Sequence, residues 1–271
     1  MAVCGKELTT DHFRLHRYLC WSPRAPLPGP APGGLRVGID GQPLTPRPQA
    51  RVDDLAGRYD LAPLAAACGA VERAESLYVL DLLDRHGLAD PDRSGAGRAL
   101  DVGSKNGAYL PGLATAWPHG WDAVELDAHR RYWTLRTRRA HGEAMAGAFP
   151  GCRFHAADVR SLDGSYARIT WFLPFVHPDA HAAWGLAPAT FAPAELLAHV
   201  LERLTPDGRM LVVNQGEAEA EAQGALFARS LAVASTGPDA TFTSTALGRI
   251  DSDLSPFRKP RFGWIVTRAD V

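Results

Sequence analysis

Small and polar side chains that could hold a ligand follow a short apolar run at residues 98–102. The segment Leu-Asp-Val-Gly-Ser-Lys-Asn-Gly occupies 100–107, and a helix-compatible stretch begins at Ala108. A strand, a tight turn and a helix start together present backbone N–H groups to an anionic or polar ligand. We therefore expect a cofactor to bind at this turn, with Asp101 and Gly103 beside it.

Carboxylates also end the next two apolar runs, 121–126 and 152–157. Glu125 at the first of these ends could accept two hydrogen bonds from a ribose diol, and Asp158 at the second could accept one from an exocyclic amine. Because ligands of open α/β sheets bind at the carboxyl ends of the strands, we expect these side chains to meet at one edge.

The elements that must position these residues alternate from residue 98 onward. The strand candidates are 98–102, 121–126, 152–157, 169–174, 209–214, 241–250 and 262–268, and the helix candidates are 108–117, 129–148, 193–204 and 218–231. This alternation predicts an α/β fold of Rossmann-like type, a doubly wound and mostly parallel sheet with helices on both faces. The last two strands are separated by a turn-rich stretch without a helix, so we expect the seventh and last strand to be antiparallel.

The N-terminal part has a different composition. Residues 9–20 are compatible with a short helix, and 23–48 are rich in proline, which predicts an irregular arm with a hairpin turn at Asp40-Gly41. Residues 70–86 carry a helical apolar stripe. We expect two parts, an extension at 1–95 that forms a lid or a dimer-forming segment, and a catalytic domain at 96–271.

Composition narrows the class of protein. The 271 residues are 46% hydrophobic and 22% charged with a net charge of −1, which is ordinary for a globular enzyme and gives no global attraction to nucleic acid or anionic membranes. The four cysteines are scattered without metal-ligand spacing, and no apolar run approaches the roughly 20 residues that span a bilayer. We expect a soluble, cytoplasmic protein that does not bind membranes.

Five elements in order resemble the class I S-adenosylmethionine-dependent methyltransferases, over residues 98–271. They are the glycine-bearing turn at 100–107, the acidic strand end Val-Glu-Leu-Asp at 124–127, the Ala-Asp-Val segment at 157–159, the Leu-Thr-Pro-Asp-Gly-Arg-Met-Leu segment at 204–211 and the closing strand pair. The resemblance implies S-adenosylmethionine as cofactor and S-adenosylhomocysteine as product. It implies cofactor contacts from Asp101, Gly103, Ser104, Lys105, Gly107, Glu125, Leu126, Asp158, Val159 and Phe172.

Lys105 departs from the family pattern, because it occupies the position of the middle glycine in the first motif. That glycine lets the backbone approach the cofactor without a Cβ in the way. Three interpretations stay open: an ammonium that contacts the carboxylate of the cofactor, a side chain that points to solvent, and a damaged pocket on a non-catalytic scaffold.

The acceptor side carries weaker signals. His177, just past the fourth strand, is the candidate general base, with a surface histidine as the alternative. Asn214 and Glu217 could orient a substrate, and Tyr78 or Trp184 could form a wall of the pocket, although each also suits packing or surface. His177 lies near two further metal-ligating side chains in His-Pro-Asp-Ala-His at 177–181, but a polar loop accounts for them, and we expect no metal.

Basic residues lie on the predicted helix at 129–148, and basic residues beside aromatic ones can bind RNA. The cluster consists of Arg130, Arg131, Arg136, Arg138 and Arg139, with Trp133 nearby. Five arginines over ten helical residues spread around the helix, so we expect a solvated face rather than a nucleic-acid interface.

The sequence thus predicts methyl transfer from S-adenosylmethionine to an oxygen or nitrogen atom of a small-molecule acceptor. The expected partners are that acceptor and, if the extension dimerises, a second copy of the chain. Two alternatives remain, a methyltransferase that acts on RNA or protein, and a non-catalytic cofactor-binding or scaffold protein.

Overall fold

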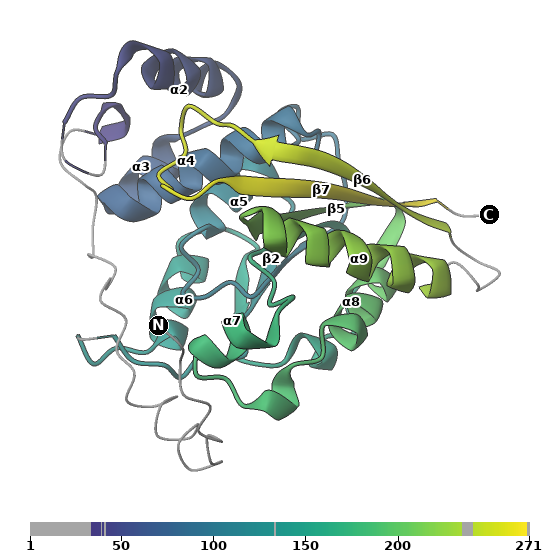
Figure 1. Ribbon diagram of the computed structural model, residues 1–271. Helices are drawn as coiled ribbons and strands as arrows, with labels where there is room; N and C mark the ends of the chain where they lie inside the picture. The colour runs from purple at the N-terminus through teal and green to yellow at the C-terminus, as the bar shows by residue number, and fades with distance from the viewer. Residues whose placement is uncertain (1–33, 39, 41, 133, 235–240, 270–271) are drawn as a thin grey trace.

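The computed structural model describes residues 34–38, 40, 42–132, 134–234 and 241–269 (Figure 1). Within these residues seven strands form one sheet in the order β3-β2-β1-β4-β5-β7-β6. The strands are β1 (Ala99–Val102), β2 (Trp121–Val124), β3 (Arg153–His155), β4 (Tyr166–Phe172), β5 (Leu204–Gln215), β6 (Thr241–Ile250) and β7 (Arg261–Ala269). The helix expected at 9–20 lies outside the described residues.

The pairing pattern confirms the predicted fold class. Strands β1 to β5 are parallel to one another, and β7 is antiparallel to both β5 and β6. Strands β4 and β5 begin several residues earlier than the sequence pattern indicates, because Tyr166 pairs with Leu204 ahead of the main β4–β5 register. The chain order reverses between β1 and β4, which is the point where ligands of doubly wound sheets bind.

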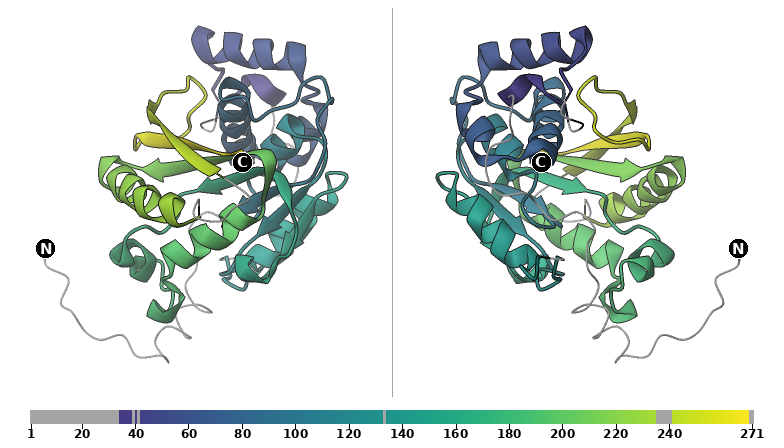
Figure 2. Two further views of the ribbon diagram at one scale, coloured as in Figure 1. Left: turned by 90° about the vertical axis from the view of Figure 1, so that its right-hand side faces the viewer. Right: turned by 90° about the vertical axis from the view of Figure 1, so that its left-hand side faces the viewer.

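Helices cover both faces of this sheet (Figure 2). They are α2 (Pro46–Arg58), α3 (Ala62–Ala67), α4 (Ala70–Arg85), α5 (Leu110–Ala116), α6 (Arg138–Gly147), α7 (Pro178–Ala183), α8 (Pro193–Glu202) and α9 (Glu217–Ala234), with 3-10 turns η1 (Gly34–Arg36), η2 (Val159–Ser161) and η3 (Pro188–Thr190). Successive side chains of a strand point to opposite faces. In β5, Leu211 and Val213 therefore pack with α4 and α5, whereas Met210 and Val212 pack with α8 and α9.

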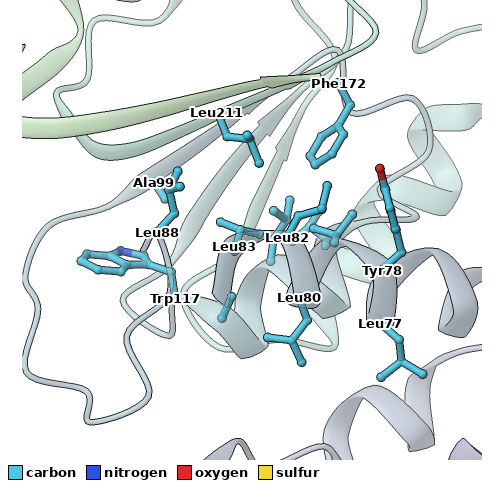
Figure 3. Close-up of a cluster of buried hydrophobic side chains, with 14 of the residues drawn as sticks. Leu77, Tyr78, Leu80, Leu82, Leu83, Leu88, Ala99, Trp117, Phe172 and Leu211 are labelled. Carbon is cyan, nitrogen blue, oxygen red and sulfur yellow. The ribbon is translucent and has the colours of Figure 1, made fainter. Parts of the chain in front are cut away.

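Helix α4 lies between the sheet and α2, and its leucines are buried on both sides. In Figure 3, Leu82 and Leu83 point toward Leu211 and Phe172 of the sheet, whereas Leu80 points to the opposite side of the helix. Each buried leucine contributes about 1.5–3 kcal/mol of hydrophobic stabilisation. The described residues before 96 thus share one core with the sheet. The division at 95/96 and the lid or dimer role stay predictions.

The irregular arm expected at residues 23–48 is wrong at its C-terminal end, because helix α2 begins before residue 48. The helix begins at Pro46, and Pro48 also lies in its first turn. Proline is tolerated there because the first backbone N–H groups of a helix have no partner within it. Helices α3, α5, α7 and α8 likewise have proline in their first two positions. Upstream, Gly38 N–H donates to the carbonyl of Gln42, as the hairpin prediction requires.

Helix α6 begins nine residues later than the predicted 129–148 helix. Residues 129–132 and 134–137 instead lie in a loop in which Arg131 and Thr137 make an antiparallel bridge. The hydroxyl of Thr137 then caps the helix by accepting from the N–H of Ala140 at 3.1 Å. The expected solvated face of arginines is also wrong in part, because Arg130 and Arg138 are buried.

No helix in the described ranges is long and apolar enough to cross a membrane.

Candidate functional site

A cavity of about 530 Å³ opens at the carboxyl ends of the parallel strands. The residues after β1, β2, β3 and β4 line one side of it, and the segment from α7 to the start of α8 lines the other. Its position at the reversal between β1 and β4 is the one that the strand order predicts for a ligand. Of the predicted cofactor contacts, seven line the cavity: Gly103, Lys105, Glu125, Leu126, Asp158, Val159 and Phe172.

The turn after β1 uses left-handed backbone at three positions. Gly103, Lys105 and Gly107 have φ of +72°, +56° and +74°. A Cβ at Gly107 would lie 3.3 Å from the Cα of Gly142 in α6, so glycine permits the close packing of turn and helix there. A Cβ at Gly103 would meet nothing within 4 Å, so this backbone is open to a ligand. Lys105 therefore has a backbone conformation that glycine adopts more readily than lysine does.

Glu125 holds this turn from the end of β2. Its Oε2 accepts from the N–H of Lys105 at 2.7 Å, and its Oε1 accepts from the N–H of Asp127 at 2.7 Å. Burial raises the pKa of the Glu125 carboxyl, and the nearby Arg138 guanidinium acts in the opposite direction. Because each carboxylate oxygen accepts more than one hydrogen bond, both oxygens retain capacity for a diol in the cavity.

Arg138, which lines the cavity, and Arg130 belong to an ion-pair cluster that sequence reasoning missed. Asp127 Oδ2 lies 2.6 Å from Nε of Arg130 and 3.2 Å from Nη1 of Arg138, and all three residues are buried. Both guanidinium groups stack on the ring of Trp184, at 5.4 and 5.1 Å from its centroid, and Arg130 donates to the carbonyl of Trp184. This cluster fastens the segment after α7 over the cavity.

Three predicted cofactor residues support the turn from behind instead of lining the cavity. Asp101 is buried, and its Oδ1 accepts from the hydroxyl of Thr170 at 2.7 Å. Burial raises the pKa of the Asp101 carboxyl to about 7. Ser104 is also buried and donates to the carbonyl of Asp101, while Gly107 packs against α6. Their role in this structure is to shape the turn.

Asp158 lines the cavity and is hydrogen-bonded to Arg160. Its carboxylate accepts from Nη2 of Arg160 at 2.7 Å and from the backbone N–H of Arg160 at 2.9 Å. These hydrogen bonds lower the pKa of the Asp158 carboxyl. The side chain is thus ionised and able to accept further hydrogen bonds from an amine.

Aromatic and apolar side chains form the remaining wall. They include Trp171, Phe172, Leu173, Pro174, Phe175, Trp184, Leu186, Phe191 and Leu196. Leu173 has φ of +55°, a strained conformation for a branched side chain, and its N–H donates to the carbonyl of Val213 at 2.7 Å. This conformation bends the chain at the end of β4, and Pro174 and Phe175 after it line the cavity.

The structure brings His181, and not the predicted His177, into the cavity lining. His177 precedes α7, and its Nε2 lies 3.3 Å from the carbonyl of Ala218. Nε2 of His181 lies 3.0 Å from the hydroxyl oxygen of Thr190, which donates its own proton to the carbonyl of Ala187. Neutral His181 therefore carries its proton on Nε2, and burial lowers its pKa.

The other predicted acceptor-side residues divide in the same way. Trp184 lines the cavity, whereas Tyr78, Asn214 and Glu217 do not; Gln215 and Glu219 occupy the positions expected for the last two. Among the described residues, no group of three or more His, Cys, Asp or Glu side chains is arranged to hold a metal ion.

No protein-family model and no curated protein matches the chain. Solved structures of low sequence identity are similar in fold. An S-adenosylmethionine-dependent methyltransferase from Aquifex aeolicus is 12% identical, with a TM-score of 0.47 over 73% of this chain and 92% of that one. An amino pentose methyltransferase from Micromonospora echinaspora involved in calicheamicin biosynthesis is 18% identical, with a TM-score of 0.44 over 72% and 92%. Magnesium protoporphyrin IX methyltransferase from Synechocystis is 11% identical, with a TM-score of 0.44 over 72% and 80%.

The strand order and the antiparallel β7 define a Rossmann-like, doubly wound α/β fold, and its cavity lies at the reversal point.

Proposed function

We propose that the protein is an enzyme that transfers the methyl group of S-adenosylmethionine to an oxygen or nitrogen atom of a small-molecule acceptor. The observation that carries the proposal is Glu125, whose carboxylate fastens the turn after β1 and faces the cavity with capacity for a ribose diol. In this proposal Asp158 accepts from the adenine amino group, and Leu126, Val159 and Phe172 surround the base.

S-adenosylmethionine, when bound, supplies an electrophilic methyl group on a sulfonium leaving group. The chain's own contribution is then position and exclusion of water, since in-line placement of an acceptor supplies much of the rate. His181 is the base candidate that the geometry favours, because its Nδ1 carries a lone pair when the ring is neutral. The mechanism does not require a strong base, because the leaving group is already activated.

A small acceptor suits the cavity better than a macromolecule does. The segment from α7 to α8 forms part of the apolar wall. The guanidinium groups of Arg130 and Arg138 stack on Trp184 and hold this segment in place. The buried Arg130 and Arg138 are engaged with Asp127, so they do not form the exposed basic face that RNA requires. The cytoplasm remains the proposed compartment, since Cys68 and Cys152 are free thiols that suit a reducing environment.

Calorimetric titration with S-adenosylmethionine and S-adenosylhomocysteine tests the cofactor assignment. We expect wild-type protein to bind both, and Glu125→Ala to bind each at least about 100-fold more weakly, because two hydrogen bonds to a charged group are lost. Glu143→Ala is the matched control, since Glu143 is a half-exposed carboxylate that pairs with Arg139 on α6. No heat with wild-type protein would support the scaffold alternative instead.

A further inference from the structure

A second cleft, of about 500 Å³, lies between the N-terminal helices and the connection from β6 to β7. In Figure 1 this connection is the yellow loop beside α4. Six basic side chains line the cleft, against two aspartates: Arg47, Arg85, Arg249, Arg258, Lys259 and Arg261. The lining of the cleft therefore carries an excess of positive charge in a protein whose net charge is −1.

Three of the six cations have carboxylate partners. Arg85 lies 2.8 Å from Asp81, Arg249 lies 2.8 Å from Asp251, and Arg47 lies 3.5 Å from Asp253. No described carboxylate lies within ion-pair distance of the other three, Arg258, Lys259 and Arg261. Arg258 and Lys259 are exposed, so water solvates their charge.

Arg261 is different because it is only 6% exposed. Its Nη1 donates to the neutral side-chain oxygen of Gln215 at 2.8 Å, and its guanidinium stacks on the ring of Phe257 at 4.4 Å. A buried cation without an anionic partner is costly, and an anion bound in the cleft would remove that cost. A planar guanidinium also matches the oxygens of a carboxylate or phosphate group.

The second cleft, here called the basic cleft, adjoins the cavity of about 530 Å³ at the strand ends, here called the large cavity. Lys259 lines both, and Gln215, the hydrogen-bond partner of Arg261, lines the large cavity. A molecule with one end beside Arg261 could therefore extend past Lys259 toward the residues at the end of β4.

We infer that the basic cleft holds an anionic group of the methyl acceptor, a carboxylate or a phosphate, through Arg258, Lys259 and Arg261. The assignment of this anion to the acceptor rests on the proposed methyltransferase function. It narrows the substrate class to acidic small molecules that present their methylated atom several bonds away from the acidic group.

Titration of the full chain with pyrophosphate and with citrate at fixed ionic strength tests the inference. We expect saturable binding of at least one of the two, and the stronger binder identifies a phosphate or a carboxylate site. Arg261→Gln and Lys259→Gln should each weaken this binding about tenfold, which corresponds to the loss of one charge-assisted hydrogen bond. Arg93→Gln, an arginine outside both cavities, is the control and should bind as wild type does.

S-adenosylhomocysteine binding, measured on the same samples, separates the two proposals. Unchanged binding in Arg261→Gln, whose side chain does not line the cofactor cavity, shows that the variant is folded and that its loss of anion binding is local. The anion site is refuted if neither anion binds to wild-type protein, or if both variants bind it undiminished. Failure of wild-type protein to bind S-adenosylhomocysteine would overturn the proposed function, and with it the assignment of the anion to an acceptor.

Discussion

The buried arginines beside the two cavities differ in the charge of their partners. Beside the large cavity, Arg130 and Arg138 are buried against the carboxylate of Asp127, with Glu125 3.7 Å from Arg138. Beside the basic cleft, Arg261 is buried against the neutral Gln215. A cation that the protein itself neutralises holds the fold together, whereas one left without an anion is available to a ligand. Substitutions at the two places should therefore change the free energy of unfolding by different amounts.

The largest effect is expected from Asp127→Asn. Because the substitution removes the charge between two buried guanidinium groups, we expect the free energy of unfolding to fall by about 3–5 kcal/mol. Urea denaturation followed by circular dichroism measures it. Glu143→Gln, which breaks the half-exposed pair with Arg139, should change stability by less than about 1 kcal/mol. Equal effects of the two substitutions would contradict the structural role of Asp127.

Asp101 is a buried carboxyl without a cationic partner, and its effect should depend on pH. Its pKa is raised from 3.8 to about 7, so folding takes up a proton between these values. The free energy of unfolding should therefore fall as the pH rises from about 4 to 7. Asp101→Asn, which mimics the neutral form, should lack this contribution. Denaturation curves of both proteins across this range give the difference, and parallel profiles would refute the raised pKa.

Replacement of Lys105 by glycine should be stabilising, because it relieves a left-handed conformation that costs a side-chain-bearing residue about 1–2 kcal/mol. The greater flexibility of glycine in the unfolded chain offsets part of this gain, which leaves about 0.5–1 kcal/mol. Asp207→Gly is the matched control, with φ of +58° outside both cavities. Equal gains in the free energy of unfolding would mean that the backbone strain is the same at the two positions. The affinities of both variants for S-adenosylhomocysteine then show what the Lys105 side chain contributes to binding, and decide among its three interpretations.

The smallest change in stability is expected from Arg261→Gln, in spite of its burial. The substitution removes an uncompensated cation, so the loss of its stacking on Phe257 is offset and stability should stay within about 1 kcal/mol of wild type. Thermal unfolding without added anions measures this. A loss comparable to that of Asp127→Asn would mean that the protein already neutralises Arg261.

The sequence predicted the part of the site that local patterns determine. Glu125 and Asp158 follow apolar runs, and a carboxylate at the end of a parallel strand is placed at the sheet edge by the strand itself. The conformation at Lys105 also follows from the short turn around it. The position of Asp101 in the motif can be read from the sequence, and it predicts a contact with the cofactor. Whether the side chain faces the cavity or the core depends on the orientation of the strand in the sheet.

The remaining residues depend on contacts between distant segments. Arg130 meets Trp184 54 positions further along the chain, and Arg261 meets Gln215 46 positions earlier. No periodicity within 129–148 indicates that the first nine residues leave the helix to make such contacts. His177 and His181 are separated by one helical turn, and only the packing of α7 determines which of them lines the cavity.

Lys259 belongs to the walls of both cavities, and this has a thermodynamic consequence. When one side chain borders two binding sites, a ligand that moves or neutralises it in one site alters the free energy of binding in the other. Such coupling is reciprocal. An anion in the basic cleft changes the affinity for S-adenosylhomocysteine by some factor, and S-adenosylhomocysteine must change the affinity for that anion by the same factor. Substitution of Lys259 should bring this common factor closer to one.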